Sequence, residues 1–177
     1  MKRTTETVTV SRTDQLMNPA SRRDFLRLMG IGGAIVFLPS ALISCDDGGL
    51  PVQTPGSGGT VTIDFAKGDI AVLQFAFALE QLEADFYSRV ASNFGASGLS
   101  AAEQTIFADI RNHEVIHREA LRTVLGSANT FTIEPVYNDV SFGSRTSILA
   151  TAKAFEDLGV AAYNGAAQYL TSVNNLL

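Results

Sequence analysis

The densest run of hydrophobic residues starts at Asp69 and stops before Gly95, in the segment DIAVLQFAFALEQLEADFYSRVASNF. Asp69 is a suitable helix N-cap, and the spacing predicts one long helix. Its apolar positions cover more than one narrow stripe: Val72, Phe75, Phe77, Leu79, Leu82 and Phe86. A helix that is apolar over so much of its surface is buried among neighbouring elements.

A second helix is predicted from the capping box formed by Ser100 and Glu103, with a stop at Gly126. Between these signals one set of residues recurs at three- or four-residue intervals and predicts a buried stripe: Ile106, Ile110, Glu114, His117, Leu121 and Val124. The stripe includes a carboxylate and an imidazole. Since a buried carboxylate costs several kcal/mol without compensation, it needs a partner, a proton or a metal.

A third helix is predicted over residues 145–170, with the inner positions Ile148, Ala152, Phe155, Glu156, Gly159, Tyr163 and Ala166. The segment 127–143 before it is too long for a tight turn between antiparallel helices. It indicates a crossover along the outside of a bundle, with an extended piece near 131–133. The domain is therefore expected to be all-α.

The N-terminal 44 residues have the layout of an export signal. Arg22 and Arg23 precede an uncharged run from Leu28 to Ser44 that is short for a membrane span of roughly 20 residues. The paired arginines resemble a twin-arginine signal. An amphipathic or transmembrane N-terminal helix is the alternative, although the glycines in the run disfavour it.

Leu42, Ile43, Ser44 and Cys45 resemble a lipobox, in which the cysteine is lipidated. As the only cysteine in the chain, Cys45 has no partner for an internal disulfide; a free cysteine near an ordinary cleavage site is the alternative. The following residues are rich in Gly, Pro, Ser and Thr. We therefore expect a signal over 1–44, a flexible tether over 45–63 and a folded domain over 64–177.

From Cys45 onward the chain has seven Lys and Arg against fifteen Asp and Glu, a net charge of −8. Phosphate backbones attract the opposite charge, so nucleic acid is not an expected partner. The chain also lacks a Walker-type or G-x-G-x-x-G loop. No segment after Cys45 is apolar enough to predict a membrane span.

The sequence RNHEVIHREA contains two overlapping metal motifs. His113, Glu114 and His117 form H-E-x-x-H, the pattern of zinc proteases, in which two histidines hold the metal and the glutamate activates water. Glu114 and His117 alone form E-x-x-H, a ligand pair of di-metal helical bundles. The chain has only these two histidines and no convincing strands for a protease substrate sheet, which favours the second motif.

An internal repeat links the first and third helices. FALEQLEADFY aligns with KAFEDLGVAAY, which pairs Glu80 with Glu156 and Tyr87 with Tyr163. Each tyrosine follows its glutamate by seven residues, about 10 Å along the same helix face. We expect each tyrosine to pack in the core with its hydroxyl bonded to a carboxylate, and a redox role for either tyrosine is the alternative. Glu83 aligns with Gly159, which favours Glu80 as the inward carboxylate.

On the strings FALEQLEADFY, HEVIHREAL and AFEDLGVAAYNGAA, residues 64–177 resemble the bacterial ferritin-like domain family that includes exported, desiccation-associated proteins. The resemblance implies a four-helix bundle with a long crossover and a carboxylate-histidine site for iron or manganese. It implies metal ligation by Glu80, Glu114, His117 and Glu156. Neighbouring positions that would support these ligands are Glu83, Tyr87, His113 and Tyr163.

The chain carries only three of the four helices, and the second E-x-x-H of the family pattern is missing. We expect either that the sequence is a fragment whose full-length chain supplies the fourth helix, or that a second subunit covers the bundle as a homo-oligomer. Three carboxylates and one or two imidazoles suffice for a single-metal or incomplete di-metal site.

The sequence thus predicts an exported ferritin-like protein of the cell envelope, held on the periplasmic side of a membrane by lipid on Cys45, in iron handling or oxidative-stress and desiccation protection. A catalytic site would be ferroxidase-like or another di-metal oxidoreductase. Two alternatives stay open: a metal-free helical binding or protective module tethered to the membrane, and an H-E-x-x-H zinc hydrolase.

Overall fold

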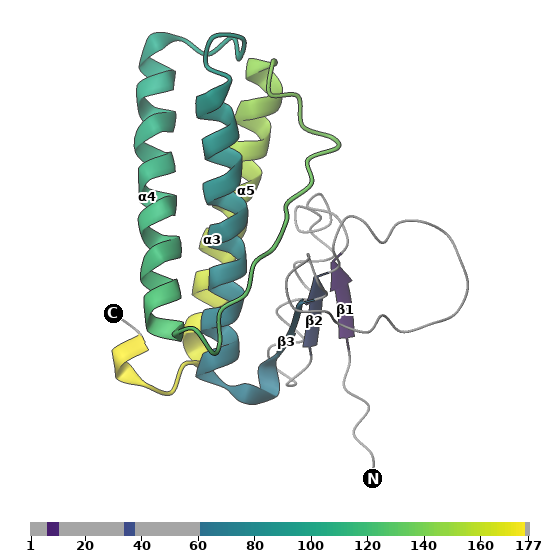
Figure 1. The fold of residues 1–177 in the computed structure, drawn as a ribbon, viewed down its shortest axis with the longest axis vertical. Helices are drawn as coiled ribbons and strands as arrows, with labels where there is room; N and C mark the ends of the chain where they lie inside the picture. The colour runs from purple at the N-terminus through teal and green to yellow at the C-terminus, as the bar shows by residue number, and fades with distance from the viewer. Residues whose placement is uncertain (1–6, 11–33, 38–60, 176–177) are drawn as a thin grey trace, which may run out of the picture.

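The structure is a computed structural model, and it describes residues 7–10, 34–37 and 61–175. Three long helices dominate it: α3 (Asp69–Ser92), α4 (Ala101–Leu125) and α5 (Arg145–Ala166). Figure 1 shows them as an upright bundle, with α3 between α4 and α5 in this view. The expected all-α architecture with three helices is confirmed.

A small sheet precedes the helices, with strand order β1 (Thr7–Val10), β2 (Ala34–Phe37) and β3 (Val61–Asp64). β1 pairs parallel with β2, and β2 pairs antiparallel with β3, with Phe37 opposite Val61. The sequence had not indicated these strands. β3 begins at Val61, inside the segment assigned to the tether and three residues before the predicted start of the domain at residue 64.

Helix α3 is the centre of the core because it packs against both other helices. Fifteen of its residues are buried, and they include all six apolar positions named from the sequence. Two clusters of buried residues surround it. One joins Ile63, Phe65 and Phe75 near the start of α3, and the other joins Phe86 and Phe155 near its end.

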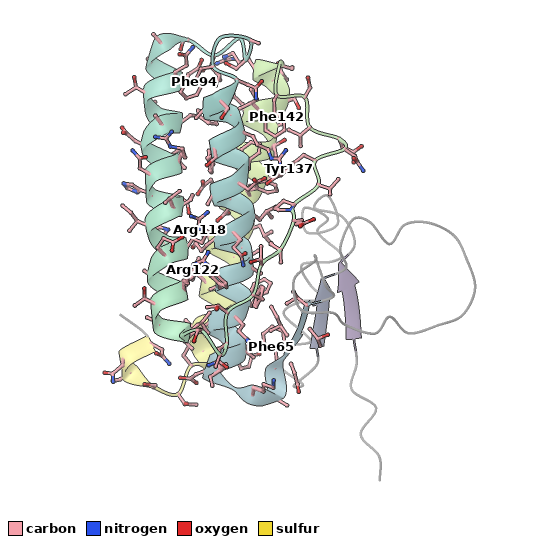
Figure 2. The ribbon with its side chains drawn as sticks, in the orientation of Figure 1. Phe65, Phe94, Arg118, Arg122, Tyr137 and Phe142 are labelled. Atoms are coloured by element: carbon pink, nitrogen blue, oxygen red, sulfur yellow. The ribbon has the colours of Figure 1, made fainter. Side chains whose placement is uncertain are left out.

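The segment after α4 covers α3 on a further side, as the crossover prediction required (Figure 1). The Tyr137 hydroxyl donates to the Leu82 carbonyl at 2.9 Å, and the Ile133 amide donates to Gln81 Oε1 at 3.2 Å. Figure 2 shows Tyr137 and Phe142 between this segment and the helices. No regular strand forms near 131–133, because a side chain of α3 rather than another strand receives the backbone hydrogen bond.

Helix α4 begins as predicted, with reciprocal hydrogen bonds between Ser100 and Glu103, and it ends at Gly126, whose φ of 67° suits glycine. The predicted buried stripe is only partly correct. Glu114 is buried, but Ile106 is 56% and Val124 is 62% exposed. That side of α4 has no covering element among the described residues, so local periodicity alone overestimated its burial.

The third helix is shorter than predicted. α5 ends at Ala166 and continues as two short 3-10 turns, η3 (Ala167–Tyr169) and η4 (Val173–Asn175). Asp69 is also not the N-cap of α3, since Gly68 holds that position. Within the part of the chain that the structure describes, none of the helices has the length and apolarity needed to cross a membrane.

Candidate metal centre

Three side chains from α3 and α4 meet near the middle of the bundle: Glu80, Glu114 and His117. One ligand atom from each lies within 4.8 Å of the others. His117 Nδ1 is 3.3 Å from Glu114 Oε2 and 3.5 Å from Glu80 Oε2. The E-x-x-H spacing places Glu114 and His117 on adjacent turns of α4, and Glu80 faces them from α3.

Burial differs sharply across this Glu80–Glu114–His117 cluster. Glu80 is 2% exposed and Glu114 is 7% exposed, whereas the His117 side chain is 53% exposed. His117 was expected on the buried stripe and instead lies at the rim. The cluster therefore has a buried carboxylate floor and a solvent-accessible imidazole.

The two repeat-related tyrosines each bond a carboxylate on the opposite helix. Tyr163 on α5 donates a hydrogen bond to Glu80 Oε1, and Tyr87 on α3 donates to Glu156 Oε1 at 2.6 Å. The expected hydroxyl-carboxylate bonds are present. Burial, followed by the neighbouring carboxylates, raises the pKa of both tyrosines above its ordinary value. Both hydroxyls therefore stay protonated as donors.

The second oxygen of Glu80 gives a direct test of whether a cation fits. Oε2 is buried and has no hydrogen-bond partner among the described residues, although it faces the imidazole of His117. An unpaired buried polar oxygen is costly, and native structures rarely leave one. Burial and then a hydrogen bond with the Glu114 carboxyl raise the pKa of Glu80 to about 8, so a proton on Glu80 competes with a cation for this position. A bound cation would stabilise the ionised form that these surroundings disfavour.

Glu83 is a second buried carboxyl of α3, 5% exposed, and its Oε1 would lie 3.4 Å from a Cβ placed on Gly159. The repeat had favoured Glu80 alone as inward-facing. Both are buried, because the glycine of α5 leaves room for the Glu83 side chain. Burial, followed by the charge of Glu80, raises the pKa of Glu83 to about 9. In the sequence, the signal for the burial of Glu83 was the glycine that aligns with it in the internal repeat, Gly159.

Two other candidates lie outside the cluster. Glu156, proposed as a ligand, is exposed and accepts the hydrogen bond from Tyr87. His113 is exposed, and its ring centroid is 6.3 Å from that of His117. Of the two histidines that a zinc protease would use together, His117 lies with the two carboxylates and His113 lies outside this described group. The lipidation candidate Cys45 lies outside the described residues.

The donor set of the cluster is two carboxylate oxygens and one imidazole nitrogen. Oxygen donors with one imidazole suit iron or manganese in the divalent state, whereas thiolate donors, which would favour softer ions, are missing from the described part of the site. The residues present therefore fit a hard or borderline divalent metal ion.

An all-α bundle with carboxylates and an E-x-x-H histidine from its helices fits the class of helical bundles that can hold a metal ion. A family model described as a ferritin-like domain matches residues 68–177. The chain belongs to the ferritin-like domain family. Over the residues that the structure describes, the three long helices are consistent with a ferritin-like bundle that lacks one helix. No curated protein and no solved structure is significantly similar to the chain.

Proposed function

We propose that this protein is an exported ferritin-like protein that binds iron through Glu80, Glu114 and His117. The observation that carries the proposal is the buried Oε2 atom of Glu80, which finds no hydrogen-bond partner within the described part of the chain and faces the imidazole 3.5 Å away. A cation between these groups would satisfy an oxygen that the protein leaves unpaired.

Each residue has a separate part in this proposal. Glu80 and Glu114 supply negative charge from inside the bundle, and His117 supplies a neutral nitrogen at the exposed rim. Tyr163 holds the other oxygen of Glu80 and so fixes the direction of that carboxylate. The buried face of α3 limits the access of water to this side of the cluster.

Bound iron would supply redox chemistry with oxygen or peroxide, which supports a role in iron handling or in protection against oxidative stress and desiccation. Manganese fits the same donors and is the second ion to test. The partial exposure of His117 supports access of small molecules to the rim. Fold alone does not choose among these chemistries.

We also infer export by a twin-arginine signal, with lipid on Cys45 holding the domain at the cell envelope. Arg22, Arg23 and the Leu42–Cys45 sequence support this proposal. A twin-arginine route would allow the bundle to fold and take up its metal before it leaves the cytoplasm. Mass spectrometry of Cys45 in the membrane fraction tests it: unmodified cysteine on a full-length N-terminus contradicts it.

The metal proposal is tested on the full chain by anaerobic Fe(II) titration, with elemental analysis of the washed protein. We expect bound iron in the natural protein, loss of binding in Glu80→Gln and unchanged binding in Glu119→Gln, which alters an exposed glutamate of the same charge on α4. Repeating the titration with Mn(II) shows which of the two ions the site binds more tightly. A folded protein that retains neither ion contradicts the proposal.

A specific observation favours one other candidate, a metal-free binding or protective module. With its pKa raised to about 8, Glu80 is protonated at neutral pH, and Tyr163 already bonds its Oε1 atom. With Glu80 uncharged, the cluster has one fewer buried charge for an ion to compensate. Cooperative unfolding that EDTA leaves unchanged, in protein purified from iron-rich medium, would support this candidate over the metal site.

A further inference from the structure

His113, the second histidine of the chain, has no part in the metal centre proposed above. It lies on the exposed side of α4 and forms no hydrogen bond or ion pair within the described part of the chain. Its ring lies beside that of His117, with 6.3 Å between the two ring centroids. Residues four apart share one face of a helix, so α4 by itself holds the two imidazoles side by side.

His117 turns only one of its two ring nitrogens toward the Glu80–Glu114–His117 cluster. Nδ1 lies 3.3 Å from Glu114 Oε2 and 3.5 Å from Glu80 Oε2. A neutral ring that donates its Nδ1 proton to these carboxylates keeps its lone pair on Nε2. Histidines that bind metal ions commonly donate their other N–H to a carboxylate, which fixes the ring. The contact between Glu114 and His117 therefore leaves Nε2 as a ligand atom for an ion outside the cluster.

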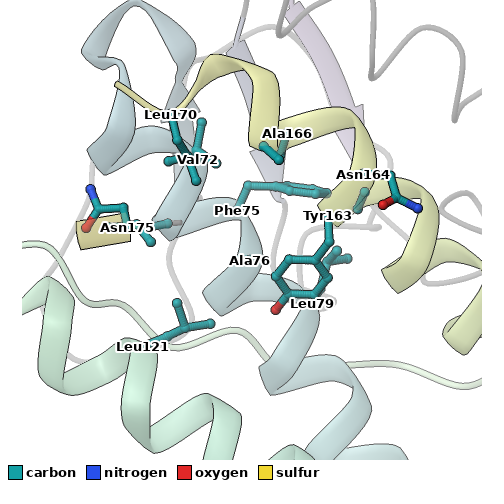
Figure 3. A pocket seen from close by; sticks show the side chains of 13 residues that line it. Val72, Phe75, Ala76, Leu79, Leu121, Tyr163, Asn164, Ala166, Leu170 and Asn175 are labelled. Carbon is teal, nitrogen blue, oxygen red and sulfur yellow. The ribbon is translucent and has the colours of Figure 1, made fainter. Parts of the chain in front are cut away.

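Solvent reaches both imidazoles. The His117 side chain is 53% exposed, and His113 is exposed as well. Figure 3 shows Leu121, one turn after His117 on α4, across a groove from Tyr163 of α5. The groove thus borders the open side of the cluster. Because both imidazoles belong to α4, an ion held by them needs no ligand from another helix.

The two nitrogen donors select the class of ion. Two histidines four residues apart on one helix are the zinc ligands of the H-E-x-x-H motif. With metal–nitrogen bonds of about 2.0–2.1 Å, two rings that share an ion have centroids about 5 to 6 Å apart. The 6.3 Å separation is close to this, and a small rotation of the exposed His113 ring supplies the difference. Imidazole suits zinc, copper and nickel, whereas manganese prefers carboxylate oxygens.

We propose that His113 and the Nε2 atom of His117 form an outer position for an imidazole-preferring divalent ion, such as Zn(II), Cu(II) or Ni(II). A neutral imidazole has one ring nitrogen free to bind a metal, so His117 serves either the outer position through Nε2 or the cluster through Nδ1. An ion in the outer position therefore weakens the binding of iron or manganese in the cluster. This consequence rests on the proposed function, whereas the outer position itself does not.

The outer position is tested by calorimetric titration of the untagged full chain with Ni(II), after alkylation of Cys45 to exclude binding by its thiol. We expect one saturable site per chain. His113→Ala removes one of the two nitrogens and should weaken Ni(II) binding at least tenfold. Ile116→Ala changes a 63% exposed position on the same helix and should bind Ni(II) as the natural chain does.

A double variant separates the spacing of the imidazoles from their number. His113→Ala combined with Asn112→His keeps two histidines on α4, but they are five residues apart and lie on different faces of the helix. This variant should bind Ni(II) as weakly as His113→Ala. Residues 112 and 113 are both exposed, so we expect circular dichroism to show retained helices.

The outer position is overturned if the natural chain shows no saturable Ni(II) binding. It is equally overturned if either the single or the double variant binds Ni(II) as tightly as the natural chain does. The second result would mean that two imidazoles anywhere on the helix suffice, or that Ni(II) binds elsewhere.

A competition experiment tests the shared use of His117. Saturating Ni(II) should weaken Mn(II) binding at least tenfold in the natural chain and much less in His113→Ala. Equal Mn(II) affinity with and without Ni(II) would contradict the shared use of His117. A chain that binds Ni(II) through His113 but retains neither Mn(II) nor Fe(II) would contradict the proposed function while supporting the outer position.

Discussion

The hydroxyl of Tyr163 on α5 donates a hydrogen bond to the carboxylate of Glu80 on α3. The repeat-related pair, Tyr87 on α3 and Glu156 on α5, makes the same bond in the reverse direction. The two bonds join α3 to α5 through both copies of the repeat. Only the first of them reaches a member of the Glu80–Glu114–His117 cluster.

This asymmetry predicts different effects of two matched substitutions. Tyr163→Phe removes the donor that orients Glu80 and should weaken Fe(II) binding by about ten- to hundredfold, as loss of a supporting hydrogen bond does at other metal sites. Tyr87→Phe removes the equivalent bond to Glu156 and should change the affinity by much less. Calorimetric titration of both variants measures this. Equal losses would mean that Glu156 is also a ligand.

Substitutions of the two histidines should also differ in their effect on metal binding to the cluster. His117→Ala removes the imidazole of the cluster and should weaken metal binding by more than about 100-fold, beyond the effect of a supporting residue. His113→Ala should leave binding nearly unchanged, because His113 lies outside the cluster. Elemental analysis of dialysed variants tests this. Equal loss of metal from both variants would favour the H-E-x-x-H zinc site instead.

The buried carboxyl of Glu83 should make the metal-free protein less stable as pH rises. Its folded pKa is about 9 against an ordinary value of 4.5, so the folded chain holds a proton that the unfolded chain releases between these values. The stabilising effect is complete below pH 4.5 and is lost as pH approaches 9. The slope is about 1.4 kcal/mol per pH unit for one group.

Glu83→Gln, which cannot ionise, should reduce that slope, measured by urea unfolding in EDTA from pH 5 to 9. The comparison uses the slope of the unfolding free energy against pH. Burying the new amide shifts this free energy by the same amount at every pH, so it leaves the slope unchanged. Glu119→Gln serves as the control, since the Glu119 side chain is about half exposed. An unchanged slope in Glu83→Gln would show that this carboxyl is ionised in the folded protein.

Asp69 should control the order of the C-terminal turns. Its hydrogen bonds, first from the Ser172 and Thr171 amides, hold the pKa of its carboxyl well below the ordinary value, so it stays ionised at neutral pH. Asp69→Ala removes the acceptor for these amides. Their hydrogen exchange should accelerate at least tenfold, as measured by NMR.

Asp157→Ala provides the comparison for Asp69→Ala, because Asp157 pairs with Lys153 on the exposed side of α5. It should leave exchange at Thr171 and Ser172 unchanged. If both variants accelerate exchange equally, the turns are loosened by a general loss of stability and not by the loss of the Asp69 bonds.

Local signals in the sequence determined much of the helical framework. The Ser100–Glu103 capping box and Gly126 placed both ends of α4, because caps depend on residues within one turn of the helix end. The breadth of apolar positions predicted that α3 is central. The spacing in RNHEVIHREA placed Glu114 and His117 on neighbouring turns, which any α-helix would do.

Other features depended on which elements pack together. Each tyrosine follows its own glutamate by seven residues, yet it bonds the glutamate of the other helix, because the packing of α3 against α5 brings the unlike partners together. The burial of Glu83 required Gly159 to face it. The exposure of His117 and Val124 required α4 to present one side to solvent. Helical periodicity fixes which residues share a face, and only the tertiary structure decides what that face meets.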